Sequence, residues 1–207
     1  MNRSGWRSHL TALLTALIAC VGLLSLSTAP AWATAGTITE FPIPTAESGP
    51  DGITAGPDGN LWFTTTTNEI GRITTKGHVT GFPIPTANSI PFGITAGPDG
   101  NLWFTEWNVG IIGRITTSGS ITEFHVSTKS SGPFGITAGP DGNLWFTLSF
   151  GNSIGRITTA GSSTLFPLPR TCGNRFGCHP EGITAGPDGN VWFAENRGDK
   201  IGRITTQ

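Results

Sequence analysis

The feature that most constrains this chain is a segment of thirteen residues, GITAGPDGNLWFT, which occurs three times without change. These copies begin at Gly52, Gly93 and Gly135, and a fourth, GITAGPDGNVWFA, begins at Gly182. The intervals are 41, 42 and 47 residues, and two further segments recur in step, IGRITT and a segment similar to TEFPIP. Self-similarity at such a period indicates a repeat architecture in which each repeat is one supersecondary unit.

Each repeat contains four short strand candidates. Gly-Ile-Thr-Ala comes first, and Pro-Asp-Gly-Asn after it is a hairpin signal because glycine accepts positive φ without steric cost. Leu-Trp-Phe-Thr and Ile-Gly-Arg-Ile-Thr-Thr follow. The fourth candidate, Ile-Thr-Glu-Phe-Pro-Ile-Pro, carries prolines that suit an outer edge strand. Four antiparallel strands in every repeat predict an all-β fold, a β-propeller of four-stranded blades with four blades in this chain.

Residues that every repeat shares are interpreted as scaffold. We expect the tryptophan of the second strand to pack between neighbouring blades, since a repeated buried aromatic side chain supplies contact area. We expect the arginine of the third strand to bond to carbonyl groups or to the turn aspartates. These residues are Trp62, Trp103, Trp145 and Trp192, and Arg72, Arg114, Arg156 and Arg203.

The repeats are offset by one strand. The chain begins with a strand of the fourth type at Thr37–Pro44 and ends with one of the third type at Ile201–Thr206. The predicted propeller domain therefore covers 34–207, with repeats at approximately 45–86, 87–128, 129–169 and 170–207, and with 35–44 closing the last blade. The sequence leaves three assemblies open: a closed ring of four blades, a homodimeric ring of eight, or part of a larger ring.

Residues 1–33 are interpreted as a secretory signal peptide. Arg3 and Arg7 precede the apolar run Leu10–Leu26, and Ala31-Trp32-Ala33 is a small-x-small cleavage site. The run is shorter than the roughly 20 residues of a spanning helix, so no stable membrane insertion is expected. A lipoprotein cleavage box at Cys20 is the disfavoured alternative, because the chain stays apolar after it. The predicted location is secreted or cell-surface.

The charge balance argues against nucleic acid as a partner. Without Arg3 and Arg7, the chain has 10 basic residues against 13 acidic ones. No basic cluster is present, and such a cluster is the footprint of a nucleic-acid-binding surface.

The repeated segments GPDGNLWFTE, IGRIT and TEFPIPT resemble those of the streptogramin B lyase (virginiamycin B lyase) family, and the resemblance covers residues 35–207. It implies a β-propeller, of seven blades in that family, and an enzyme that opens a cyclic depsipeptide antibiotic by elimination at its ester bond. A general base removes the proton α to a carbonyl, and Mg²⁺ stabilises the developing negative charge. The implied ligand is a small cyclic peptide, and the implied cofactor is Mg²⁺.

The resemblance also points to site residues. In the family the motif Glu-Pro-His-Gly-Ile precedes an inner strand, and a further Glu follows a Trp-Phe strand. The last repeat has the two residue types in exchanged order, as His179-Pro180-Glu181-Gly182-Ile183. We therefore expect His179 as general base and Glu181 and Glu195 as Mg²⁺ ligands. The expected substrate-binding residues are Asp51, Phe92, Glu106, Trp107 and Phe134.

The largest difference between repeats is an insertion before His179. It contains Cys172 and Cys178, the two cysteines that remain after signal removal. In an exported protein, so close a pair favours a disulfide that stiffens the loop, over a zinc site with an incomplete ligand set. Two functions remain open at this point: an exported lyase, and a non-catalytic propeller that binds a peptide, a glycan or a protein partner.

Overall fold

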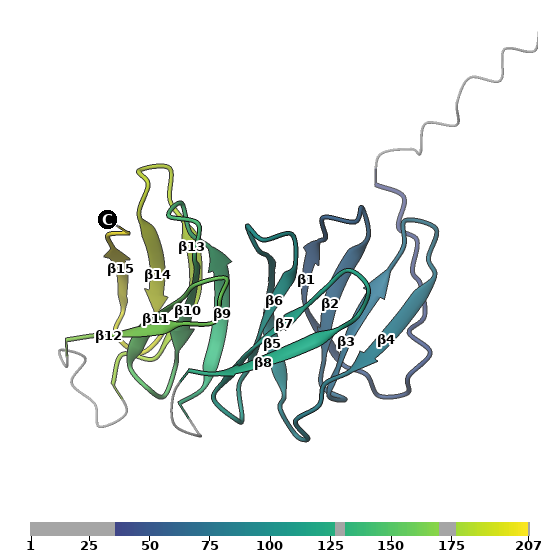
Figure 1. Ribbon diagram of the computed structural model, residues 1–207, viewed down its shortest axis with the longest axis horizontal. Coiled ribbons are helices and arrows are strands. Elements are labelled where there is room, and N and C mark those ends of the chain that lie inside the picture. The colour runs from purple at the N-terminus through teal and green to yellow at the C-terminus, as the bar shows by residue number, and fades with distance from the viewer. Residues whose placement is uncertain (1–35, 127–130, 170–176, 207) are drawn as a thin grey trace, which may run out of the picture. The chain divides into compact units, whose positions relative to one another are not determined.

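Strands are the only regular elements in the part of the chain that the structure describes. This structure is a computed structural model, and it describes residues 36–126, 131–169 and 177–206 (Figure 1). Contacts divide the chain into Met1–Glu40 and Phe41–Gln207, and every strand lies in the second unit. The described residues form four antiparallel sheets, which confirms the all-β propeller with four blades in this chain.

Each sheet is a meander, in which successive strands of the chain pair with one another. The first sheet contains β1 (Pro50–Ala55), β2 (Leu61–Thr65), β3 (Glu69–Ile73) and β4 (Val79–Pro83). The second contains β5 (Pro91–Ala96), β6 (Leu102–Glu106), β7 (Ile111–Ile115) and β8 (Ile121–His125). The third contains β9 (Pro133–Ala138), β10 (Leu144–Leu148), β11 (Ser153–Ile157) and β12 (Ser163–Pro167). The fourth contains β13 (Pro180–Ala185), β14 (Val191–Glu195) and β15 (Lys200–Ile204).

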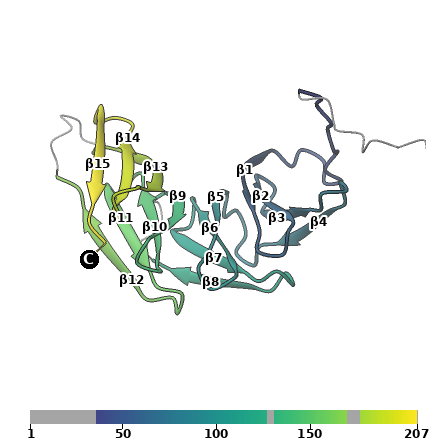
Figure 2. The ribbon, with the colours of Figure 1, turned by 90° about the horizontal axis from the view of Figure 1, so that it is seen from above.

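The first strand of each sheet is the inner strand. β1 contacts β5, β5 contacts β9, and β9 contacts β13, whereas no contact of similar extent joins β13 to β1 in the described residues. Figure 2 shows β5 beside β9, with β8 and β12 at the opposite edges of their sheets. Only glycine fits this close approach: a Cβ on Gly52 or Gly93 would collide with the backbone of the next inner strand.

The repeated Pro-Asp-Gly-Asn turn is held by its aspartate. In the first repeat, Asp58 accepts hydrogen bonds from the Asn60 side chain at 2.7 Å and from the Trp62 indole N–H at 3.0 Å. Gly59 has a φ of 75°, the left-handed conformation that glycine adopts easily. Partial burial raises the pKa of Asp58, but these hydrogen bonds outweigh it, so the pKa lies below its ordinary value. The turn thereby fixes the tryptophan that packs between blades.

Three apolar clusters join the four sheets, and each contains the tryptophan of one blade and second-strand residues of the next. Trp62 lies with Leu102 and Phe104, Trp103 with Leu144 and Phe146, and Trp145 with Val191 and Phe193. These three tryptophans are 0 to 1% exposed, as the packing interpretation predicts.

The repeated arginines are scaffold residues as well. Arg72 and Arg114 donate to carbonyl oxygens of the following blade, those of Thr117 and Thr159, at 3.1 and 3.2 Å. Arg203 instead reaches the Asp188 carboxylate of its own turn at 3.2 Å. Both kinds of partner, carbonyl group and turn carboxylate, are those that the sequence predicts.

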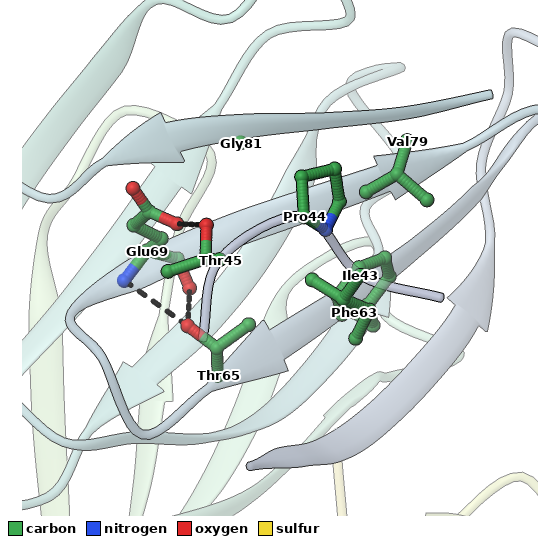
Figure 3. Close-up of a pocket in the computed structure, with 9 residues that line it drawn as sticks. Ile43, Pro44, Thr45, Phe63, Thr65, Glu69, Val79 and Gly81 are labelled. Carbon is green, nitrogen blue, oxygen red and sulfur yellow. Dashed lines mark hydrogen bonds between the residues drawn. The ribbon is translucent and has the colours of Figure 1, made fainter. Parts of the chain in front are cut away.

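The structure differs from the sequence expectation at the N-terminal segment. Residues 36–44 contain no strand, and the fourth sheet has three strands, so no described residue between 36 and 44 completes it. Ile43, Pro44 and Thr45 instead line a small pocket on the first sheet, where the Thr45 hydroxyl donates to Glu69 at 3.1 Å (Figure 3). The predicted signal peptide, 1–33, lies outside the described residues. Within those residues no helix is long and apolar enough to span a bilayer.

Candidate functional site

The candidate site is a cavity of about 270 Å³ at the start of the four inner strands. Every inner strand contributes the same three positions: the residue after the proline, the glycine and the isoleucine. Glycine and isoleucine repeat in all four blades, whereas the residue after the proline is Asp51, Phe92, Phe134 or Glu181. The cavity therefore collects the four positions at which otherwise identical strands differ, with one carboxylate at each end of the series and two aromatic rings between them.

The residue before the proline adopts a left-handed conformation in every blade. The φ values are 48° for Gly49, 51° for Ile90, 65° for Gly132 and 55° for His179. Glycine meets this requirement at no steric cost in two blades, whereas a side chain in the left-handed region costs of order 1 kcal/mol or more. Every blade has this conformation, so it belongs to the scaffold; in the last blade the residue that adopts it, His179, contacts the cavity residue Glu181.

Two neighbours hold the Glu181 carboxylate. His179 Nδ1 lies 3.0 Å from Glu181 Oε1, and the Asn196 side-chain amide donates to Glu181 Oε2 at 3.0 Å. Both carboxylate oxygens are thus engaged, while the residue still lines the cavity. His179 is only 9% exposed, it is not among the cavity-lining residues, and its Nε2 atom is buried without a hydrogen-bond partner in the described residues.

An aromatic run continues outward from the cavity. Phe92 stacks on Phe134 with 4.8 Å between ring centroids and meets Trp107 edge-on at 6.0 Å. Trp107 then contacts Phe150 at 5.4 Å, and Phe150 contacts the His179 ring at 5.0 Å. The run therefore connects the two cavity rings to the His179–Glu181 pair. Of the predicted residues, the cavity and this run bring together a set of six: Asp51, Phe92, Trp107, Phe134, His179 and Glu181.

The chain matches the model of a known protein family. The model of the virginiamycin B lyase family matches residues 28–207. The chain belongs to that family. The solved virginiamycin B lyase from Staphylococcus aureus is 47% identical, with a TM-score of 0.78 over 82% of this chain and 57% of the lyase chain. A solved streptogramin B lyase is 43% identical, with a TM-score of 0.76 over 81% of this chain and 55% of that one.

A further structure of this family contains a ligand. It is a catalytically inactive His-to-Ala variant of the S. aureus virginiamycin B lyase with quinupristin, 47% identical to this chain with a TM-score of 0.78. The match covers 57% of the length of that lyase chain and 83% of the length of this chain. This family member thus spans 55 to 57% of the length of the solved lyases that it matches.

Glu106 does not line the cavity of this chain. It is fully buried, and neither of its carboxylate oxygens has a hydrogen-bond partner among the described residues. Burial, with the charge of Glu123 as a second cause, raises the pKa of Glu106 to about 8. A carboxyl group without exposed surface cannot contact a substrate in this arrangement, so the structure separates Glu106 from the other predicted binding residues.

Glu195 does not line the cavity with Glu181. It is 9% exposed, it is paired in the sheet with Pro180 and Lys200, and it is absent from the cavity lining. No three His, Cys, Asp or Glu side chains of the described residues gather as metal ligands. Glu181 is the one predicted ligand that lines the cavity, and His179 and Asn196 already occupy its oxygens. The described residues therefore assemble no three-ligand group, and the predicted Mg²⁺ site stays a prediction.

The loop before His179 lies partly outside the described residues. Cys178 is disulfide-bonded and 1% exposed, whereas its predicted partner Cys172 falls in the undescribed segment 170–176, so that pairing stays a prediction. Asn152 receives a hydrogen bond from the Cys178 backbone N–H at 2.6 Å, which ties the end of the loop to the third blade.

Sequence reasoning missed two residues of this site, Asn196 and Phe150. Both follow the second strand of their repeat, at positions where the repeats disagree: Asn196 corresponds to Trp107 and Ser149, and Phe150 to Asn108. Differences between the repeats identified the four cavity positions, and the same criterion could have identified Asn196 and Phe150.

Proposed function

We propose that this protein is an exported streptogramin B lyase-like enzyme that opens a cyclic depsipeptide by elimination at its ester bond. The observation that carries the proposal is the Glu181 carboxylate, which lines the cavity while His179 and Asn196 hold it. A positioned carboxylate of this kind can accept a proton from a bound substrate. Membership of the virginiamycin B lyase family supports elimination as the reaction.

The reaction needs few protein groups. A base takes the proton from the carbon α to a carbonyl, and the electron pair of that C–H bond forms a carbon–carbon double bond. The bond from the β carbon to the ester oxygen then breaks, and the oxygen departs as part of a carboxylate. No water is consumed, so the opened product has the same mass as the cyclic substrate.

Glu181 is the base in this proposal, and His179 is its positioning partner. The reason is access: Glu181 lines the cavity, whereas the free nitrogen of His179, Nε2, is enclosed. The contact of 3.0 Å between Nδ1 and Oε1 fixes the direction of the carboxylate. It also allows the imidazole to share the proton that Glu181 receives. The sequence analysis assigned the general base to His179; in this proposal Glu181 takes that role.

The aromatic run suits a ligand with apolar or aromatic side chains. Phe92 and Phe134 form one wall of the cavity, and Phe150 is 46% exposed at the outer part of the run. Stacking and edge-to-face contacts between aromatic rings contribute about 0.5–1.5 kcal/mol each beyond area burial. A cyclic peptide with aromatic side chains is therefore the class of ligand that we propose for this surface.

Export through residues 1–33 and dependence on Mg²⁺ are further parts of the proposal that rest on the sequence and on the family resemblance. Since no three of the described His, Cys, Asp or Glu side chains gather as ligands, no step of the reaction is assigned to the ion. Mg²⁺ that keeps several waters can be held by one or two carboxylates. The experiment therefore compares conversion in the presence of Mg²⁺ with conversion in EDTA.

The test is conversion of quinupristin, followed by chromatography and mass spectrometry. The protein is purified from cells that express residues 1–207, and the reaction is run with Mg²⁺ and with EDTA. We expect an opened product of unchanged mass, and a fall in kcat of about 10²–10⁴-fold in Glu181→Gln, as for loss of a general base. Glu47→Gln makes the same chemical change at an exposed residue outside the cavity and should convert normally.

A product heavier by one water would show hydrolysis and would refute elimination. No conversion by a folded protein that still binds quinupristin would favour the second candidate, a non-catalytic binding propeller. One observation favours that candidate: the Nε2 atom of His179 is buried, so this nitrogen cannot take a proton from a ligand in the cavity. Absence of both binding and conversion would refute a streptogramin ligand altogether.

A further inference from the structure

The residue before the third strand has the same backbone conformation in every blade. Its φ is positive in all four repeats, at Asn68 (66°), Gly110 (71°), Asn152 (45°) and Asp199 (50°). Glycine, asparagine and aspartate are the residue types that adopt this left-handed conformation most readily. The backbone at this position therefore belongs to the scaffold, whereas the side chain differs, and only the first and third blades carry an asparagine.

Asn152 joins the outer strand of the third blade to the segment that enters the fourth. Its side-chain oxygen accepts a hydrogen bond from the Cys178 backbone N–H at 2.6 Å, and its side-chain amide donates to the Leu168 carbonyl oxygen at 3.3 Å. The Leu168 N–H in turn donates to the Asn152 carbonyl oxygen at 2.9 Å. A Cβ on Gly177 would collide with the Asn152 side chain, so the two segments approach closely. One asparagine therefore holds the residue that directly precedes His179.

His179 itself is held from both of these blades. From the third blade, Phe150 lies two residues before Asn152 and meets the His179 ring edge-on at 5.0 Å. From the fourth blade, the Asn196 backbone N–H donates to the His179 carbonyl oxygen at 3.1 Å. The His179 ring then contacts the Glu181 carboxylate at 3.0 Å. The direction of this carboxylate therefore depends on contacts that cross the junction between the third and fourth blades.

The first blade contains the same arrangement away from the histidine. The Asn68 amide donates to the Ile84 carbonyl oxygen at 3.0 Å, and the Asn68 side-chain oxygen accepts from the Ser89 backbone N–H at 2.8 Å. Ser89 occupies the position of Cys178 in its repeat. The asparagine contact therefore occurs at two junctions, and only the one at Asn152 leads to a histidine and a carboxylate.

The second blade shows that the fold itself does not need this side chain. Gly110 stands at the equivalent position, and its carbonyl oxygen still accepts a hydrogen bond from the Val126 N–H at 3.3 Å, as that of Asn152 does from Leu168. The path of the backbone is thus the same with glycine as with asparagine. The substitution Asn152→Gly therefore copies a residue that this chain already uses, and it removes only the side-chain link to the next blade.

We infer that Asn152 is a positioning residue of the candidate site: by tying Cys178 to the third blade, it fixes His179 and, through His179, the direction of the Glu181 carboxylate. Its effect on turnover rests on the proposed function, whereas its effect on the position of His179 does not. A general base acts only within hydrogen-bond reach of the proton that it removes, so a small displacement lowers the rate of the chemical step.

The first measurement needs no turnover. Protein purified from cells that express residues 1–207 is treated with diethyl pyrocarbonate, which modifies accessible imidazole nitrogens, and the modified peptides are quantified by mass spectrometry. His179 Nε2 is buried, whereas His78 and His125 are exposed and calibrate the reagent in every sample. In Asn152→Gly, modification of His179 should become about 2- to 10-fold faster, the shift in local opening expected on loss of one or two hydrogen bonds. Asn68→Gly removes the same contacts at another junction and should leave His179 protected.

The second measurement is the conversion of quinupristin by the same variants. In Asn152→Gly, kcat should fall by about 10- to 100-fold through misplacement of the base, while KM stays within about twofold. In Asn68→Gly, kcat should stay within about twofold of wild type, although the melting temperature should fall as far as in Asn152→Gly. Asn152→Asp keeps an oxygen that can accept the Cys178 N–H, and aspartate suits this backbone, as Asp199 shows. It should restore most of the protection of His179 and most of kcat.

The two measurements separate this inference from the proposed function. Equal protection of His179 in wild type and in Asn152→Gly would overturn the inference, whatever the turnover. Equal exposure of His179 in Asn68→Gly and Asn152→Gly would overturn it too, because a general loss of stability would then explain the effect. Loss of protection in Asn152→Gly alone, with no conversion by wild type, would support the positioning of His179 and refute the lyase function. Loss of protection with an unchanged kcat would overturn the role in turnover.

Discussion

The blade junctions and the cavity differ in how they use the same repeat. At the junctions, the repeats agree: Trp62, Trp103 and Trp145 are buried alike and lie in equivalent clusters. At the cavity, the inner strands share glycine and isoleucine, but the preceding position differs in type between the blades. Agreement between repeats thus marks residues that every blade needs for packing, whereas disagreement marks residues that only one place in the ring needs.

The His179 position links the two regions. Its left-handed backbone is a property of the scaffold, because the equivalent residue has positive φ in all four blades. Its side chain belongs to the site, because it contacts Glu181. The scaffold therefore fixes the backbone of each blade at the cavity, and the side chain that occupies this backbone is free to vary.

The largest expected effect tests the scaffold side of the comparison. Trp145→Ala should lower the free energy of unfolding by about 3–5 kcal/mol, the cost of removing a large buried aromatic side chain. Trp192→Ala should cost less than half as much, because this tryptophan of the last blade is only partly buried. Chemical denaturation of both variants at low protein concentration measures the difference. Equal losses would contradict the difference in burial between the two tryptophans.

The next effect tests the site side. His179→Gly removes the contact with Glu181 but suits the left-handed backbone, as Gly49 and Gly132 show. We expect kcat for quinupristin to fall by about 10²-fold while the melting temperature changes little. Glycine in place of Ile90 is the matched control, since it relieves the same strain in another blade. If His179→Gly unfolded the protein, His179 would be a packing residue and the comparison would fail.

A third prediction concerns Glu106, a predicted binding residue whose side chain is fully buried and does not line the cavity. Its raised pKa of about 8 means that the folded protein keeps this carboxyl protonated at pH values where the unfolded chain, near the ordinary value of 4.5, has released the proton. The folded state therefore binds more protons, and stability falls as pH rises from about 4.5 to 8, with a slope of up to about 1.4 kcal/mol per pH unit.

Glu106→Leu, which copies Leu148 at the equivalent position of the third blade, should remove this slope and stabilise the protein most at pH 8. Urea unfolding at several pH values measures it. A slope that persists in the variant would assign the titration to another group.

The smallest expected effect is at the outer aromatic run. Phe150→Ala should raise the KM for quinupristin by roughly 2- to 10-fold and leave kcat within twofold, since one aromatic contact contributes about 0.5–1.5 kcal/mol. Leu165→Ala, at a similarly exposed apolar residue outside the run, should change neither constant. A fall in kcat without a change in KM would place Phe150 with the His179–Glu181 pair instead of with ligand binding.

The repeat predicted the fold well because its physics is local. The Asp-Gly turn, the apolar segment around Trp and Phe, and the prolines of the outer segment each determine a strand or a turn from neighbouring residues. The choice of Asp51, Phe92, Phe134 and Glu181 as positions of interest also followed from the sequence, and they do line one cavity.

The remaining features depended on contacts between distant segments. Nothing near Glu106 in the sequence indicates that its carboxyl is enclosed beside Glu123, or that Asn196 reaches back to Glu181. The sequence also could not determine the position of the N-terminal segment, because its residues suit both the outer edge of the last blade and the surface of the first. In the structure, Ile43–Thr45 lie on the first sheet.

The most direct test of the central claim is a crystal structure of the Glu181→Gln variant with quinupristin. The variant should bind without turning over, because it keeps the cavity and loses the proposed base. The account predicts the antibiotic in the cavity of the inner strands, with its ester bond next to Gln at position 181 and an aromatic side chain on Phe92 and Phe134. A ligand bound elsewhere on the propeller, with this cavity empty, would contradict it.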